Sequence, residues 1–95
     1  MEREARSLAE VLQQFLQEQG LQEVLYMARL PKVWAEVVGT PAARSSTIRS
    51  FANGELVVEV AVPAWRMELH MRAEELRKRL NERLGQELVR RLVIR

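Results

Sequence analysis

The side chains with the greatest potential for chemistry are a single histidine, His70, and two adjacent carboxylates, Glu74 and Glu75. The chain contains no cysteine and no aspartate, which excludes thiol nucleophiles, disulfides and cysteine-bound zinc. His70 is flanked by Leu69 and Met71 in a helical pattern, where a lone histidine is usually structural or solvated. Glu74 and Glu75 lie close to Lys and Arg residues, which lower carboxylate pKa values and favour ion pairing over acid catalysis.

Other catalytic signatures are missing from the sequence. Ser45 and Ser46 have no candidate base and no nucleophile elbow. No phosphate-binding loop or dinucleotide fingerprint is present. We therefore expect a protein that is not an enzyme, with no catalytic residue, no metal site and no cofactor. An enzyme would need a metal or a carboxylate dyad that the sequence does not reveal.

Arginine dominates the charge of the chain. Thirteen of the 15 cationic residues are Arg, and the formal net charge is +2. Residues 1–43 carry four basic and six acidic side chains, a net charge of −2. Residues 44–95 carry eleven basic and seven acidic side chains, a net charge of +4. Arg makes bidentate contacts with phosphate, so the basic part favours a nucleic-acid or acidic partner. The alternative is an ordinary solvated, Arg-rich surface.

The length of 95 residues predicts one domain covering residues 1–95, with one modest core. No apolar run approaches the roughly 18 residues that cross a bilayer, and the first eight residues are too polar for a signal peptide. We expect no membrane association and a cytoplasmic location.

Residues 48–84 predict the unit against which the rest of the chain packs. Asn53-Gly54 is a strong hairpin signal, and Leu56, Val58, Val60 and Val62 alternate with the residues between them, as in a half-buried strand. Pro63 ends this strand and suits the first turn of a helix. A long helix of about 22 residues follows, with one apolar stripe formed by Trp65, Leu69, Ala73, Leu76, Leu80 and Leu84.

Two hairpin registers are compatible with the turn. A two-residue turn pairs Phe51 with Leu56 and places Arg49 on the apolar face, whereas a three-residue loop pairs Ile48 with Val58. The burial pattern favours the second register, because a slip of one residue moves every side chain to the other face. On this basis Thr47, Arg49 and Phe51 share the outer face with Glu55, Val57 and Glu59.

The N-terminal part predicts two helical segments. Ser7 and Glu10 match a capping box, and Gly20 suits the end of the first helix. The second segment, residues 21–38, contains Pro31, where we expect a break or kink. Gly39-Thr40-Pro41 ends this segment, and Trp34 is expected to anchor the core, with surface stacking as the alternative.

The C-terminal residues 88–94 predict a third strand. The strand–helix–strand connection is expected to be right-handed, with the third strand parallel to the second. Leu88, Leu92 and Ile94 are expected to face the core, and Arg90 to extend its charge to solvent. On the exposed face of the long helix, ion pairs of i,i+4 spacing are expected: Glu68–Arg72, Glu74–Lys78 and Glu75–Arg79. The predicted fold is α+β, with helices on one face of a three-stranded sheet.

The open face of this sheet is the predicted ligand surface. The candidate nucleic-acid-binding residues are Arg44, Arg49, Arg91 and Arg95, which would contact phosphates, and Phe51, which would stack on bases. The same residues would equally suit a solvated sheet face.

Four motifs in order give the chain a family resemblance. They are Trp34…Val37-Val38-Gly39, then Asn53-Gly54-Glu55-Leu56-Val57-Val58, then Ala64-Trp65…Glu68-Leu69, then Arg79-Leu80-Asn81…Leu84-Gly85. This order resembles the DciA-like family over roughly residues 21–94.

The resemblance implies a KH-like α+β domain and a role at bacterial replication, because DciA-like proteins are operators or loaders of the replicative DnaB-type helicase and bind DNA. The implied partners are the helicase and nucleic acid, with single-stranded DNA favoured and RNA as the alternative. The chain departs from KH domains in having no G-x-x-G loop. We expect it to lack the longer extension of many relatives, and its residues include no cysteine ribbon like that of some relatives. A protein-interaction module without nucleic-acid binding is the competing hypothesis.

Overall fold

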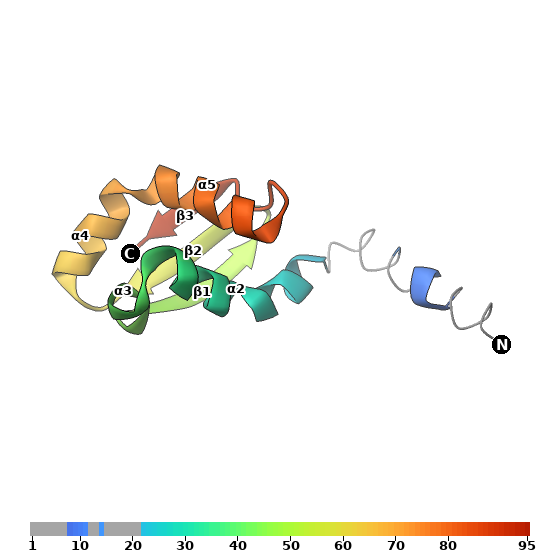
Figure 1. Ribbon diagram of the computed structural model, residues 1–95, viewed down its shortest axis with the longest axis horizontal. Coiled ribbons are helices and arrows are strands. Elements are labelled where there is room, and N and C mark those ends of the chain that lie inside the picture. The colour runs from blue at the N-terminus through green and yellow to red at the C-terminus, as the bar shows by residue number, and fades with distance from the viewer. Residues whose placement is uncertain (1–7, 12–13, 15–21) are drawn as a thin grey trace.

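The computed structural model describes residues 8–11, 14 and 22–95. The elements within residues 22–95 are α2 (Gln22–Val38), α3 (Thr40–Arg44), β1 (Ser46–Ala52), β2 (Glu55–Val60), α4 (Pro63–Met71), α5 (Ala73–Leu84) and β3 (Arg91–Ile94). The three strands form one sheet in the order β1-β2-β3, and the helices lie over it (Figure 1). The α+β prediction is confirmed. None of the described helices is long and apolar enough to cross a membrane.

The first predicted helix is described only in part. Residues 8–11 and 14 are helical, whereas Ser7 and Gly20, the predicted cap and end, lie outside the described residues. Leu8 and Val11, two apolar residues of this segment, are exposed.

Helix α2 runs without interruption through Pro31, so a break at this residue is wrong, whereas the alternative of a kink stays a prediction. A proline inside a helix removes one backbone hydrogen bond and costs about 3 kcal/mol. Leu30, Val33 and Trp34 are buried on both sides of Pro31, and this packing offsets the cost. Pro31 itself is exposed, so water can reach the backbone on that side.

The end of α2 at Val38 confirms the predicted stop. Gly39 has a φ of 89°, a value that favours glycine. The short helix α3 then begins at Thr40, with Pro41 in its first turn. The sequence analysis did not predict α3, because five residues are too few for a periodic pattern.

The β1–β2 hairpin has the Ile48–Val58 pair of the favoured register, but the three-residue loop predicted with it is wrong. Asn53 and Gly54 form a two-residue turn with φ values of 53° and 79°, so Phe51 pairs with Leu56. Further along, Ile48 nevertheless pairs with Val58, because a β-bulge at Arg49 inserts one extra residue into β1. The bulge reverses the alternation of β1 between its two halves.

Phe51 is therefore on the core side of the sheet, and its predicted place on the outer face is wrong. Its side chain is 7% exposed. Thr47 and Arg49 are exposed on the outer face as predicted. Val62, predicted to continue the buried face of β2, is instead the exposed residue that precedes α4.

The long helix is divided into α4 and α5 at Arg72, whose φ and ψ of −99° and 9° leave the helical range. Leu69, Leu76, Leu80 and Leu84 of the predicted stripe are buried, so the stripe is confirmed although the single helix is not.

The ion pairs on these helices have a different spacing from the prediction. Arg72 pairs with Glu75, and Arg77 pairs with Glu74, both at i,i+3. The break at Arg72 changes the geometry between Glu68 and Arg72. Arg77 also donates to the Val89 carbonyl at 3.0 Å, which draws it toward the loop before β3.

Strand β3 is parallel to β2, as predicted, and takes the edge beside it. It is shorter than predicted and is preceded by a loop that Asn81 holds. The Asn81 amide nitrogen donates to the Val89 carbonyl at 2.9 Å, and its oxygen accepts from the backbone N–H of Leu88 and of Val89 at 3.1 and 2.8 Å. Gly85, with a φ of 80°, ends α5 as predicted.

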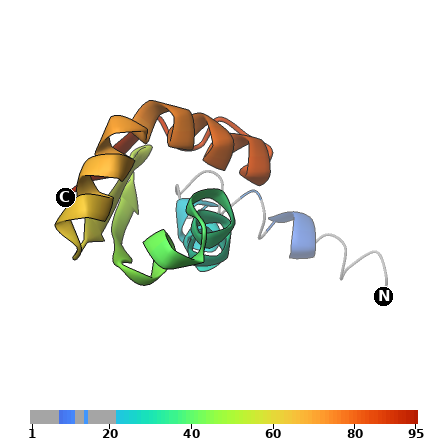
Figure 2. The same cartoon turned by 60° about the vertical axis from the view of Figure 1, so that its left-hand side comes forward.

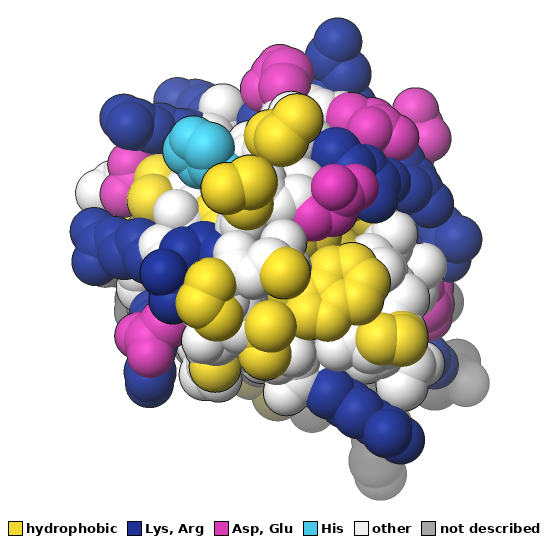
Figure 3. Space-filling model, turned by 90° about the vertical axis from the view of Figure 1, so that its left-hand side faces the viewer, with side chains coloured by type: hydrophobic (Ala, Val, Ile, Leu, Met, Phe, Trp, Pro, Cys, Tyr) yellow, Lys and Arg dark blue, Asp and Glu magenta, His cyan; other side chains and the backbone are white. Residues whose placement is uncertain are grey.

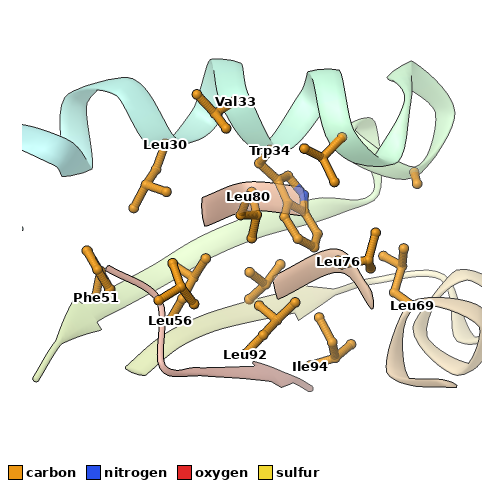
Figure 4. Close-up of a cluster of buried hydrophobic side chains, with 14 of the residues drawn as sticks. Leu30, Val33, Trp34, Phe51, Leu56, Leu69, Leu76, Leu80, Leu92 and Ile94 are labelled. Carbon is orange, nitrogen blue, oxygen red and sulfur yellow. The ribbon is translucent and has the colours of Figure 1, made fainter. Parts of the chain in front are cut away.

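The core lies between the sheet and the helical layer (Figure 4). Trp34 is 3% exposed and confirms the prediction of a core anchor. Its indole nitrogen donates to the Ser46 hydroxyl at 2.8 Å. Leu92 and Ile94 are buried as predicted, Leu88 is half-buried against the core, and Val89 is fully buried although it was not predicted to be.

Candidate nucleic-acid interface

The open face of the sheet carries three of the predicted cations, Arg49, Arg91 and Arg95, all exposed. The bulge turns Arg49 across the sheet toward Glu59, and its guanidinium donates two hydrogen bonds to that carboxylate at 3.0 and 3.1 Å. Hydrogen bonding to Arg49 lowers the pKa of Glu59, so the pair remains ionised near neutral pH. The Arg49 guanidinium is thus already paired with a carboxylate of the same chain, that of Glu59.

The other predicted residues differ in their surroundings. Arg91 lies 3.9 Å from Glu55, a loose ion pair near the hairpin end of the sheet. Arg95 follows β3 at the opposite end, where its carbonyl accepts from the Val60 N–H at 2.8 Å. Arg44 is the last residue of α3, just before β1. Neither Arg44 nor Arg95 forms a side-chain ion pair with another described residue.

The predicted site is therefore only partly assembled. Arg49 and Arg95 lie at the same end of the sheet as Glu59, whose pKa both of them lower. Arg91 lies at the other end, and Phe51 faces the core. The open face carries three arginines (Arg49, Arg91 and Arg95) and two carboxylates (Glu55 and Glu59), so its net charge is +1. The face has no exposed aromatic ring from β1, β2 or β3 on which a base could stack.

A second basic surface, which the sequence analysis did not find, lies between α2 and α5. These helices pack side by side (Figure 2). The groove between them has a volume of about 340 Å³ and is lined by Ala28, Arg29, Lys32, Val33, Glu36 and Arg83. Arg83 pairs with Glu36 across the groove. The spacing of residues in the sequence could not reveal this site, because Glu36 and Arg83 on its two walls are 47 residues apart in the chain.

An apolar surface covers the end of the molecule formed by α4 and the residues before it (Figure 3). Met67 and Met71 are 68% and 77% exposed, and Val62 is also exposed. The two methionines are four residues apart on α4 and so share one face of the helix. Figure 3 shows Lys and Arg side chains on both sides of these apolar residues. Contiguous exposed apolar residues with a polar rim are typical of a protein-binding surface.

The side chains considered for catalysis are arranged for other roles. Hydrogen bonds from Arg77 and Arg72 lower the pKa values of Glu74 and Glu75, respectively, which suits ion pairs. His70 is exposed on α4. Within the described part of the chain, no three His, Cys, Asp or Glu side chains come together to hold a metal ion.

Comparison with known proteins identifies the family. The sequence profile of the family described as "Dna[CI] antecedent, DciA" matches residues 7–94. None of the curated proteins matches the chain. The profile covers all the elements described above, from α2 to β3. The chain therefore belongs to the DciA family, whose implied role is that of a loader or adaptor of the replicative DnaB-type helicase in DNA replication.

Proposed function

We propose that the protein is a non-enzymatic adaptor that binds single-stranded nucleic acid and contacts the replicative DnaB-type helicase in the cytoplasm. The observation that carries this proposal is the family match over residues 7–94. The cations without carboxylate partners among the described residues, which include Arg44 and Arg95 on the sheet side, support the nucleic-acid part. Phe51 has no place in this interface, because it is buried.

The topology supports a KH-like interpretation of the domain. Strands β2 and β3 are parallel and are joined by two helices with a turn at Arg72. KH domains clamp backbone nucleotides with a G-x-x-G loop. The turn between α4 and α5 reads His70-Met71-Arg72-Ala73 and contains no glycine. A nucleic-acid contact must therefore use side chains, which directs attention to the basic surfaces.

The helicase part is tested by binding. The purified chain is expected to co-elute with the replicative helicase of the same organism in size-exclusion chromatography. The complex should persist when the helicase preparation has been freed of nucleic acid, because an adaptor contacts the protein directly. Separate elution at micromolar concentrations of both proteins would contradict the helicase contact.

A protein-interaction module without nucleic-acid binding is the second candidate, and the apolar surface on α4 favours it. Methionine side chains adapt to the shape of a partner, and Met67 and Met71 are among the most exposed apolar residues described. In such a protein-interaction module, the helicase or another protein would cover Met67 and Met71.

The double variant Met67→Gln/Met71→Gln tests this surface. Glutamine keeps the length and helix propensity of methionine but removes apolar area. We expect helicase binding to weaken by about tenfold, with stability changed by less than about 0.5 kcal/mol because both residues are exposed. Isothermal titration calorimetry measures the affinity. Leu25→Gln is the matched control, since Leu25 is exposed on α2; equal effects of the two changes would remove α4 as the contact.

A further inference from the structure

The groove between α2 and α5 concentrates cations that the fold does not neutralise. Arg29, Lys32 and Arg83 line it together with a single carboxylate, Glu36, so its lining carries a charge of +2. Arg83 uses that carboxylate. Arg29 and Lys32 therefore have no carboxylate partner within 4 Å among the described residues, and both are exposed. Their positions three residues apart on α2 place two like charges on one side of the helix, which is unfavourable without an anion between them.

An aromatic ring beside the groove holds one of these cations, Arg29. The Arg29 guanidinium carbon lies 5.8 Å from the centre of the Tyr26 ring, a cation–π contact. The Tyr26 hydroxyl accepts a hydrogen bond from Gln86 at 3.2 Å, which ties this part of α2 to the end of α5. The floor is apolar, since Val33 is buried beneath the charged rim. An apolar floor with cations on both walls is suited to a polyanion.

The open face of the sheet is a weaker candidate for the same ligand. Arg49 is held by two hydrogen bonds to Glu59, and Arg91 lies near Glu55. A phosphate there would have to displace a carboxylate or accept its repulsion. In the groove only Glu36 opposes the ligand, and Arg29 and Lys32 have no carboxylate to displace.

We propose that the groove between α2 and α5 is the main phosphate-binding site for single-stranded nucleic acid, with Arg29 and Lys32 on one wall and Arg83 on the other. The site reads the phosphate backbone and carries no side chain aimed at base edges, so it binds without strong sequence preference. Glu36 restrains the site by holding Arg83. This proposal rests on the proposed nucleic-acid binding and assigns it to a surface.

The double variant Arg29→Ala/Lys32→Ala tests the site by fluorescence anisotropy with a labelled oligo-dT. At low salt we expect binding to weaken by about tenfold or more, because two charge-assisted contacts are lost. The slope of log K against log salt should become less steep by about 1.4, since each phosphate contact on a single strand contributes about 0.7. Both residues are exposed, so circular dichroism should show an unchanged fold.

Two further variants sharpen the result. Glu36→Gln removes the competing carboxylate and releases Arg83, so we expect roughly threefold tighter binding. Arg91→Ala/Arg95→Ala removes the same charge as the groove variant but from the open face, and we expect a smaller loss. A parallel measurement with oligo-rU compares RNA with DNA. We expect comparable affinities for the two, because both carry the same phosphate groups.

The outcomes separate the two proposals. If the unmodified chain binds oligo-dT, and the groove variant binds as tightly as the unmodified chain or loses no more than the open-face variant, the groove assignment is wrong and nucleic-acid binding stands. If the unmodified chain does not bind oligo-dT or oligo-rU at low salt, both the nucleic-acid part of the proposed function and the groove assignment are wrong.

Discussion

Trp34→Ala is expected to destabilise the domain by about 3–5 kcal/mol, the usual cost of removing a large aromatic side chain from a core. Trp34 is buried between α2 and the sheet, and its indole nitrogen donates to the Ser46 hydroxyl at 2.8 Å. A domain of this size has only about 5–15 kcal/mol of total stability. Urea unfolding followed by circular dichroism should therefore show a much lower midpoint with a similar slope.

Trp34→Phe is the matched control for this prediction. It keeps much of the buried apolar area but removes the indole donor and part of the ring volume. The Ser46 hydroxyl still lies 3.0 Å from the carbonyls of Ala42 and Ala43, so it retains partners. We expect the Phe variant to lose about 1–2 kcal/mol. A Trp34→Ala variant no less stable than Trp34→Phe would contradict the role of Trp34 as a core anchor.

Asn81→Leu is expected to cost about 3 kcal/mol, although it replaces a polar side chain with an apolar one of similar size. Asn81 is 3% exposed and accepts hydrogen bonds from the backbone N–H groups of Leu88 and Val89. Leucine would leave these two donors unpaired, at about 1–3 kcal/mol each when they are buried. The Val89 carbonyl keeps its bond from Arg77, which limits the loss.

The measurement for this variant is the melting temperature, which should fall by roughly 15 °C for a domain of this length. The loop that Asn81 holds leads directly into β3, so the loss should reach the parallel β2–β3 pairing. Glu82→Ala, at the exposed neighbouring position, is the control and should change stability by less than about 0.5 kcal/mol. Equal melting temperatures for the two variants would show that the Asn81 network contributes little.

The features that were predicted correctly depend mainly on residues that are close together in the sequence. The hairpin at Asn53-Gly54, the stop at Gly85 and the buried stripe from Leu69 to Leu84 each follow from local chemistry, and the structure confirms them, although the turn has two residues and not the favoured three. The parallel third strand also followed, because a helix between two neighbouring strands of one sheet usually forms a crossover connection that makes the strands parallel.

The candidate site was harder to predict because it depends on two features that alternation does not encode. The bulge at Arg49 inserts one residue into β1, and this moves Phe51 from the predicted outer face to the core. A strict period of two cannot show where such an insertion occurs. The groove between α2 and α5 depends on the contact of Arg83 with Glu36, and no local spacing brings these residues together.

The most direct test of the proposed adaptor role is an unwinding assay with the replicative DnaB-type helicase on a forked DNA coated with single-stranded-DNA-binding protein. We expect the rate of unwinding to rise with the concentration of the unmodified chain, because an adaptor brings the helicase to covered DNA. The Arg29→Ala/Lys32→Ala variant should stimulate less at the same concentration. An unwinding rate that stays the same at every concentration of the unmodified chain would contradict the adaptor role.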